Sequence, residues 1–512
     1  MKRREIPKKM ERIAEKWDCE ADVVVVGYGG AGAVTAITAH DMGAEVLVLE
    51  KMGEGEEGGN TRVSAGLWLS PSEVPTFLEY LQALDPFEML PERTRELFAE
   101  ELVKNREWME GIGGEIREAG KRVEYPEAPG AHSIKAYVHR YLGAESLWYL
   151  LKENVQHREI TVIYGAPAKK LIRNDVTGEI IGVQADNAGR SLCIKARRAV
   201  VLTCGGYEFN EEMVKNYSPA YPIYFFGTPA NSGDGVLMAQ EVGANLWHMN
   251  NVMGCMWPAI LPPNWKIPIA LRFGSRHRTP YWGVIFADKY GKRFMNEGKA
   301  SRHGWGWREI LFYDGDKQEN PRIPFYIVFD DTSRRKFSPI SIGAEGYKIT
   351  WAGCFSGYEW SKDNSKEIEN GWIIKANTID KLAAKIREHC RANGEKMDSV
   401  LLEKTVAKFN EYCEAGEDPD FNRNKETLTP IETPPFYAIE AYPGSVNTQG
   451  GPKRNEKCQI LDVKDQPIPR LYSAGELGSF WVYLYNSGGN LGECLATGRI
   501  AGRNAVAERA WN

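Results

Sequence analysis

The apolar and polar positions near the N-terminus divide the chain into a strand, a helix and a second strand. Residues 23–26 are an unbroken run of valine, which is typical of a parallel strand buried on both faces. An alanine-rich run over 31–42 predicts a helix, and the apolar run over 45–49 predicts the second strand. Together these elements predict a βαβ unit.

Glycines follow the first of these strands at the spacing G-x-G-x-x-G. They are Gly27, Gly29 and Gly32. In such a unit the first glycine allows a tight turn, the second lets the backbone approach a pyrophosphate, and the third lets helix and strand pack closely. The helix N-terminus offers free N–H groups, and Glu50, which ends the second strand, can accept a hydrogen bond from a ribose hydroxyl. The pattern predicts a dinucleotide site rather than an ordinary glycine-rich turn.

Two later strands also end in glycine-rich loops. A buried run over 199–203 leads to Cys204, Gly205 and Gly206, and a third strand begins near 468 and ends in glycines by 478. The carboxyl ends of parallel strands meet at one sheet edge, so these loops should converge on one crevice. A glycine-rich loop leads into a last alanine-rich helix. The N-terminus of this helix, at 490–492, is a second candidate anion or oxyanion site.

The middle of the chain has a different composition. Tryptophan and other aromatics concentrate between about 247 and 429, where strand-like and helical stretches alternate. At 512 residues the chain also exceeds the size at which one core usually stops growing. We therefore expect an inserted second domain.

Composition and charge exclude several classes of protein. The chain is 43% hydrophobic and 26% charged with a net charge of −5, so no basic excess points to a nucleic-acid partner. No stretch of about 18 apolar residues predicts an integral membrane segment, and the first 20 residues lack the apolar core of a secretory signal. The nine cysteines form no C-x-x-C pair, which predicts no metal site and a cytoplasmic location.

Several short motifs carry a more specific resemblance. They are GYGGAG with Glu50, GGNTRVSAG, TCGGYEFN, NSGDG, YGKRFMNE, PPFYAI, LYSAGELGS, SGGNLGE and GRIAG, in that order. From about Asp22 to the C-terminus the chain resembles FAD-dependent oxidoreductases of the fumarate reductase/succinate dehydrogenase flavoprotein superfamily. Within it, the chain is most similar to 3-ketosteroid dehydrogenases of the Δ4 and Δ1 branches.

This resemblance implies an α/β fold with a Rossmann-like FAD-binding domain, interrupted by an inserted α+β catalytic cap. The expected segments are an N-terminal extension (1–20), the first FAD-binding segment (21–246), the cap that holds the substrate (247–433) and the second FAD-binding segment (434–512). The active site would lie between the two domains.

The resemblance also implies how FAD is held. Glu50 would bind the adenosine ribose, the glycine turn the pyrophosphate, Asp234 and Glu476 the ribityl or linker region, and the start of the last helix the isoalloxazine. Attachment should be non-covalent, because no histidine lies in the SAGLWLSP segment. The residues expected to bind FAD are Gly27, Gly29, Gly30, Ala31, Gly32, Glu50, Lys51, Gly59, Asn60, Thr61, Ser64, Ala65, Gly66, Ala168, Cys204, Gly205, Gly206, Asp234, Gly475, Glu476, Gly489, Asn490 and Leu491.

The predicted chemistry follows the motif Y-x-x-x-G-x-x-G, which begins at Tyr485. By the resemblance, the Tyr485 hydroxyl and the Gly489 amide would hold a ketone oxygen and stabilise the enolate that develops. A base would take the neighbouring proton while a hydride leaves to flavin N5. Ser487 is either catalytic, as the Tyr-x-Ser spacing of the Δ4 branch implies, or a cap of the last helix.

The proton-transfer residue is open. The family has a tyrosine after N-E in the cap, but this chain has Ser301, Arg302 and His303 there. Arg302 is either catalytic or substrate-binding, or else a solvated cation, and we expect His303 to be structural.

Fumarate reductases also place an arginine acid in this region. However, Asn447 stands where they have a histidine, and YNSGGNLGE lacks their arginine, so these departures count against fumarate.

The resulting prediction is an FAD-dependent dehydrogenase that forms or reduces a C=C bond beside the carbonyl of an apolar cyclic ketone, such as a 3-ketosteroid or a cyclohexanone. A separate electron acceptor or donor would be its partner. Two alternatives stay open: a reductase of an unsaturated carboxylate that uses Arg302 as acid, and an FAD electron-transfer subunit.

Overall fold

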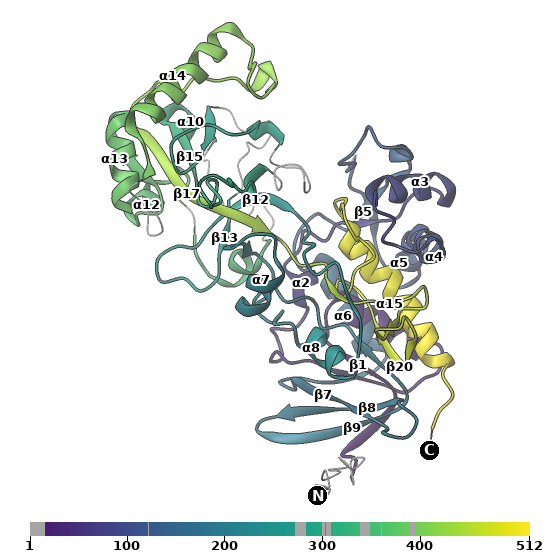
Figure 1. Ribbon diagram of the computed structural model, residues 1–512. Helices are drawn as coiled ribbons and strands as arrows, with labels where there is room; N and C mark the ends of the chain where they lie inside the picture. Colours follow the sequence, from purple (N-terminus) through teal and green to yellow (C-terminus); the bar gives the residue numbers. More distant parts are fainter. Residues whose placement is uncertain are drawn as a thin grey trace, which may run out of the picture.

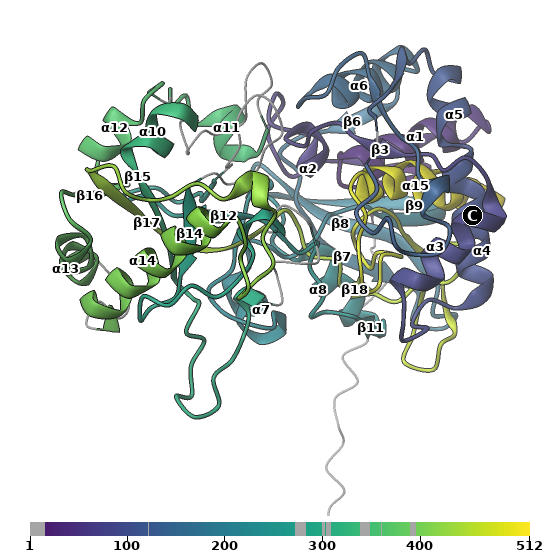
Figure 2. The ribbon, with the colours of Figure 1, turned by 90° about the horizontal axis from the view of Figure 1, so that it is seen from above.

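Two β-sheets organise the molecule, each with its own helices, as the two views show (Figures 1 and 2). The computed structural model describes residues 16–120, 122–271, 283–299, 303, 309–337, 349–359, 361–389 and 396–511. The chain builds most of the first body, passes into the second, and returns to complete the first. The predicted fold class, an FAD-binding fold with an inserted cap, is confirmed.

The first sheet has eight strands, and five of them run parallel in the order β20–β9–β1–β2–β6. The predicted βαβ unit is its centre: β1 lies between β2 and β9, and its four valines are at most 4% exposed. The strands are β1 (Cys19–Val26), β2 (Val46–Leu49), β6 (Thr161–Ile163), β7 (Ala168–Arg173), β8 (Ile180–Asn187), β9 (Arg190–Leu202), β19 (Gln459–Leu461) and β20 (Pro467–Ser473).

Two helices from opposite ends of the chain pack together against this sheet. They are α1 (Gly30–Asp41) and α15 (Gly489–Ala507), which lie side by side in Figure 2. Their approach depends on small residues: a Cβ added to Gly498 would lie 2.8 Å from the Cβ of Val34. Because α15 follows β20, the C-terminal segment completes the domain that the N-terminal segment begins.

Residues 59–157 form a layer that packs against α1 and α15. Asn105 ties this layer to α15, because its side-chain amide donates to the carbonyls of Leu69 (2.8 Å) and Gly492 (3.0 Å). The elements are α2 (Gly59–Arg62), β3 (Trp68–Leu69), α3 (Val74–Leu84), α4 (Glu92–Val103), α5 (Asn105–Gly111), β4 (Ile116–Glu118), the 3₁₀ turn Ala131–Ser133, β5 (Ala136–His139) and α6 (Ser146–His157).

The second sheet is built around one long strand, β17 (Phe436–Ser445), which pairs with β10, β12, β15 and β16. The other strands are β10 (Tyr224–Phe225), β12 (Cys255–Ile260), β13 (Ile269–Ala270), β14 (Val284–Ala287), β15 (Phe325–Asp330) and β16 (Ile374–Ala376). Its helices are α10 (Asp331–Phe337), α11 (Trp351–Phe355), α12 (Ser365–Glu369), α13 (Ile379–His389) and α14 (Ser399–Ala415), with 3₁₀ turns at Glu297–Lys299 and Lys425–Thr427. The domain boundary at 433/434 stays a prediction. The strand β17, which belongs to the second sheet, begins just after this boundary.

The remaining elements occur where the chain passes from one sheet to the other. Before β12 come α7 (Glu211–Tyr217), α8 (Asp234–Glu241) and β11 (Leu246–Trp247), and after β17 comes β18 (Gly451–Pro452).

A buried ion network fixes the YGKRFMNE segment of the cap. Glu297 is fully buried and bonds to Arg293 (2.8 Å) and Arg423 (3.0 Å), while Arg293 also reaches Asp418 (2.8 Å). Removing one member of such a network leaves an uncompensated buried charge. The network therefore holds the chain just before His303, which faces the first body.

Candidate functional site

One cavity is lined by residues of both bodies at the carboxyl edge of the first sheet. It is bordered by the loops that follow β1, β2, β9 and β20, by 59–67, and by the second-body residues Ile349 and Thr350. Its empty volume is about 1820 Å³, which includes the open mouth and the solvent space in it.

The glycine turn opens α1 towards this cavity. Gly29, the N-cap residue, is extended and has no side chain of its own to cap the helix, while the Gly30 amide donates to Thr61 Oγ1 (3.0 Å). Gly29, Gly30 and Ala31 line the cavity, so the positive end of the α1 dipole faces it and can attract an anionic group. Gly27 has φ +103°, and a Cβ there would lie 2.6 Å from the carbonyl oxygen of Thr203. A Cβ at Gly32 would lie 2.0 Å from the carbonyl oxygen of Gly27. The turn and the close packing expected of these glycines are thus present.

Glu50 lines the same end of the cavity. Its carboxylate accepts the amides of Tyr28 (2.8 Å) and Met52 (2.7 Å), which leaves lone pairs for a further donor such as a ribose hydroxyl. Burial raises the pKa of Glu50, although the two amides act against the shift. Beside it, Lys51 bonds to Asp234 (2.7 Å).

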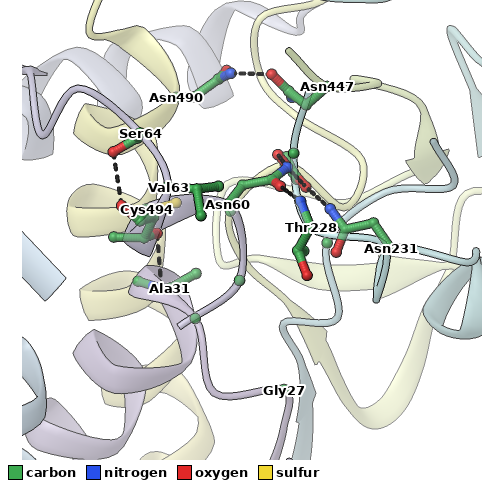
Figure 3. A pocket seen from close by; sticks show the side chains of 18 of the residues that line it. Gly27, Ala31, Asn60, Val63, Ser64, Thr228, Asn231, Asn447, Asn490 and Cys494 are labelled. Carbon is green, nitrogen blue, oxygen red and sulfur yellow. Dashed lines mark hydrogen bonds between the residues drawn. The ribbon is translucent and has the colours of Figure 1, made fainter. Parts of the chain in front are cut away.

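A network of amide side chains joins three segments across the cavity (Figure 3). Asn60 accepts the Thr228 amide (2.8 Å) and donates to Glu476 (3.1 Å), which also receives Asn231 (2.8 Å) and the Gly206 amide (3.1 Å). Burial raises the pKa of Glu476 to about 7, even though these bonds lower it.

This shift predicts a pH dependence of stability. Native Glu476 keeps its proton up to about pH 7, whereas the unfolded chain loses it near 4.5. The native state therefore binds more protons between these values, and the free energy of unfolding falls as pH rises through this window. The Glu476→Gln apoprotein lacks this contribution. The melting temperature of the variant minus that of the wild-type apoprotein should therefore be larger at pH 8 than at pH 5. Calorimetry at both pH values tests this, and a constant difference would contradict it.

The N-terminus of α15 also lies at the cavity, where Gly488, Asn490 and Leu491 are lining residues. Asn490 donates to Asn447 (2.6 Å; Figure 3). It also accepts from Gln449 (3.0 Å), so the amide groups at this wall are held in place. The Asn490 amide donates to the Tyr485 hydroxyl oxygen (3.3 Å). The Gly489 amide, expected to hold a substrate oxygen, donates instead to the Asn486 carbonyl (2.8 Å).

Tyr485 lines the cavity with its ring against Trp481 and His303, at centroid distances of 5.7 and 5.0 Å. Burial raises the pKa of Tyr485 above its usual value, although the Asn490 amide acts against this. The hydroxyl therefore keeps its proton near neutral pH and can donate it to a ligand oxygen.

Behind Tyr485 lies a cluster that sequence reasoning missed. Glu124 is hydrogen-bonded to Nδ1 of His303, and it accepts the Ser487 hydroxyl (2.5 Å) and amide (3.0 Å). Ser487 thus does not cap α15; Gly488 is the N-cap residue. Nothing in the sequence around Glu124 marks it, but His303 occupies the segment where the family has a tyrosine.

Most residues expected to bind FAD line the cavity. The exceptions are Gly32, Gly66, Gly206 and Gly489, where a Cβ would lie within 2.9 Å of other protein atoms. Arg302 lies outside the described residues. Lining residues that we did not assign include Tyr28, Met52, Val63, Leu67, Arg122, Leu142, Thr203, Phe226, Thr228, Asn231, Met253, His303, Ile349, Thr350, Val446, Asn447 and Cys494.

Comparison with known proteins agrees with this geometry. Residues 22–491 match the family model described as an FAD binding domain. The chain belongs to this family. It is 27% identical to a digoxin reductase of Eggerthella lenta over 97% of this chain and 88% of the relative. It is 28% identical to a urocanate reductase of the same organism over 98% of this chain and 77% of that relative.

The fold has a close experimental counterpart. A 3-ketosteroid Δ1-dehydrogenase from Sterolibacterium denitrificans superposes with a TM-score of 0.78 at 21% identity, over 95% of this chain and 99% of the other. The predicted resemblance is confirmed, and the chain is an FAD-dependent oxidoreductase. Two helix N-termini and the buried Glu50 at one cavity fit a dinucleotide cofactor.

In the described ranges, no helix is both long and apolar enough to cross a membrane. Within those ranges, too, no group of three or more histidine, cysteine or acidic side chains is arranged to hold a metal ion.

Proposed function

We propose that this flavoenzyme forms or reduces a C=C bond conjugated to the carbonyl of a neutral, apolar compound of the 3-ketosteroid or cyclohexanone type. The observation that carries the proposal is the buried Glu124 carboxylate behind Tyr485. A second carboxylate brought to this end of the cavity would be repelled, whereas a neutral carbonyl oxygen would not.

The rest of the wall supports a neutral ligand. Apolar lining side chains come from Val63, Leu67, Phe226, Ile349 and Val446. Among the lining residues that the structure describes, the lysine and arginine side chains are those of Lys51 and Arg122, and the histidine is His303. Lys51 is paired with Asp234 and His303 with Glu124, while the Arg122 guanidinium donates to the Ala119 carbonyl (3.2 Å).

In the proposed reaction, the Tyr485 hydroxyl donates to the substrate carbonyl and stabilises the charge that develops on its oxygen. The glycine turn, Glu50 and the Asn60–Glu476 network hold FAD without a covalent bond. When bound, FAD supplies the acceptor or donor of the hydride. The cap residues Ile349 and Thr350 border the cavity and help to exclude water.

An anaerobic titration tests this function. Cyclohexanones and saturated 3-ketosteroids are mixed with the oxidised protein, and matching enones with the dithionite-reduced protein, while flavin absorbance is recorded. We expect bleaching in the first case or reoxidation in the second. If neither class reacts but unsaturated acids reoxidise the flavin, the proposal is wrong.

A second candidate, a reductase of an unsaturated carboxylate, is favoured by the name of the urocanate reductase relative. It would use Arg302 as its acid. Arg302→Ala should then abolish reoxidation by unsaturated acids such as urocanate and fumarate. If the ketone function is correct, the same variant should keep ketone turnover within about tenfold, because Tyr485 and His303 remain in place. Stopped-flow flavin absorbance measures both.

A further inference from the structure

The Glu124 side chain is buried, with 8% of its surface exposed, and its carboxylate has four hydrogen-bond partners in Ser487 and His303. Oε1 receives the Ser487 hydroxyl and amide and lies against Nδ1 of His303, while Oε2 receives the His303 amide at 3.1 Å. Burial disfavours the charged carboxylate, but the charge and hydrogen bonds of His303, with Ser487, outweigh it and keep the pKa of Glu124 below its usual value. A carboxylate so fully bonded is a fixed negative charge.

This carboxylate determines how the imidazole of His303 can act. Because Nδ1 faces Glu124, the N–H of a neutral ring lies on Nδ1, and the lone pair lies on Nε2. No residue in the described part of the chain hydrogen-bonds to Nε2, and His303 is a wall residue of the cavity. A carboxylate that orients an imidazole and stabilises its protonated form is the arrangement that makes histidine a general base.

The position of His303 relative to Tyr485 is the second requirement. The two rings meet edge to face at a centroid distance of 5.0 Å. Both residues line the cavity, so a ketone whose oxygen accepts from the Tyr485 hydroxyl can present the carbon next to its carbonyl to His303.

We infer that His303 carries the proton to and from the carbon next to the substrate carbonyl, and that Glu124 is the positioning residue that holds its ring. The inference rests on the proposed function. In the oxidative direction, the C–H bond at that carbon breaks and its proton goes to Nε2. Its electron pair forms the C=C bond, the hydride from the next carbon goes to bound FAD, and reduction reverses these transfers.

Proton exchange isolates this step. With the flavin kept reduced by dithionite, a saturated ketone cannot lose its hydride, so only the C–H beside the carbonyl exchanges with D₂O. Mass spectrometry follows this exchange for cyclohexanone and a saturated 3-ketosteroid on the holoenzyme. His303→Gln should lower the exchange rate by about 10² or more, and imidazole should restore part of the rate to His303→Ala. His139→Gln is the matched control: it changes another buried histidine, outside the cavity lining.

The positioning role of Glu124 has its own measurements. Glu124→Gln should lower exchange about tenfold or more, and Glu124→Asp should recover part of it because the charge returns. Nitrogen NMR of ¹⁵N-histidine-labelled wild type should show the Nδ1–H form for His303, assigned by its absence in His303→Gln, without any substrate. A ring found with its hydrogen on Nε2 would overturn the role of Glu124.

The outcomes distinguish a failure of the proposed function from a failure of the role assigned to His303. If wild type exchanges neither ketone, the proposed function fails and the proton assignment falls with it. If wild type exchanges a ketone and His303→Gln does so equally fast, the function stands and His303 is not the proton carrier. Loss of exchange in His303→Gln with rescue by imidazole in His303→Ala supports the assignment, since a purely structural histidine would not respond to free imidazole.

Discussion

Replacing Tyr485 with phenylalanine should lower kcat for ketone turnover by about 10²–10³-fold, which is the usual cost of removing one donor to a developing oxyanion. The substitution removes one oxygen from a ring that Trp481 and His303 already hold, at centroid distances of 5.7 and 5.0 Å. The ring should therefore stay in place, and FAD content should be unchanged. Stopped-flow reduction of the flavin by substrate measures the loss, and the flavin spectrum of the purified variant checks the loading.

Tyr483→Phe is the matched control for this substitution. Tyr483 lies two residues away, packs its ring on Phe87 at 5.0 Å and does not line the cavity. It should keep wild-type rates. If Tyr485→Phe also kept them, the hydroxyl would not be the donor to the carbonyl, and the substrate would have to bind elsewhere along the wall.

The part of the fold that sequence could predict is the part with a strict local pattern. The predicted helix and second strand appear within one residue of their expected bounds as α1 and β2, and the valine run forms the second half of β1, which begins four residues earlier at Cys19. The association of β17 with the second sheet was harder to foresee. Its pairing with β10, β12, β15 and β16 joins residues that are far apart in sequence, and a local pattern carries no information about such register.

The same distinction applies to the site. The sequence identifies Tyr485 and Ser487 because they lie in one motif, whereas Glu124 is more than 360 positions away from its partner Ser487. The sequence predicts a structural role for His303, because a lone histidine has no recognisable function without its neighbours. Only the folded chain shows that its Nδ1 meets Glu124 and its ring meets Tyr485.

A pair of glycine substitutions should separate FAD binding from folding. At Gly29 the backbone is extended, with φ −101°, and an added Cβ would find no protein atom closer than 3.7 Å. The apoprotein should accept Gly29→Ala with little change in melting temperature. However, Gly29 lines the cavity at the start of α1, where the pyrophosphate would lie, so the methyl group should weaken FAD binding at least tenfold, or about 1.4 kcal/mol.

Gly32→Ala should fail in a different way, because its Cβ would lie 2.0 Å from the Gly27 carbonyl oxygen, inside the protein rather than in the cavity. Helix α1 could not keep its place against β1, so we expect a lower melting temperature in the apoprotein as well as lost flavin. Fluorescence titration with FAD and calorimetry of the apoproteins measure both properties. A Gly29→Ala protein that binds FAD as tightly as wild type would show that the pyrophosphate does not approach this turn, and the dinucleotide assignment of the glycine motif would then have to be abandoned.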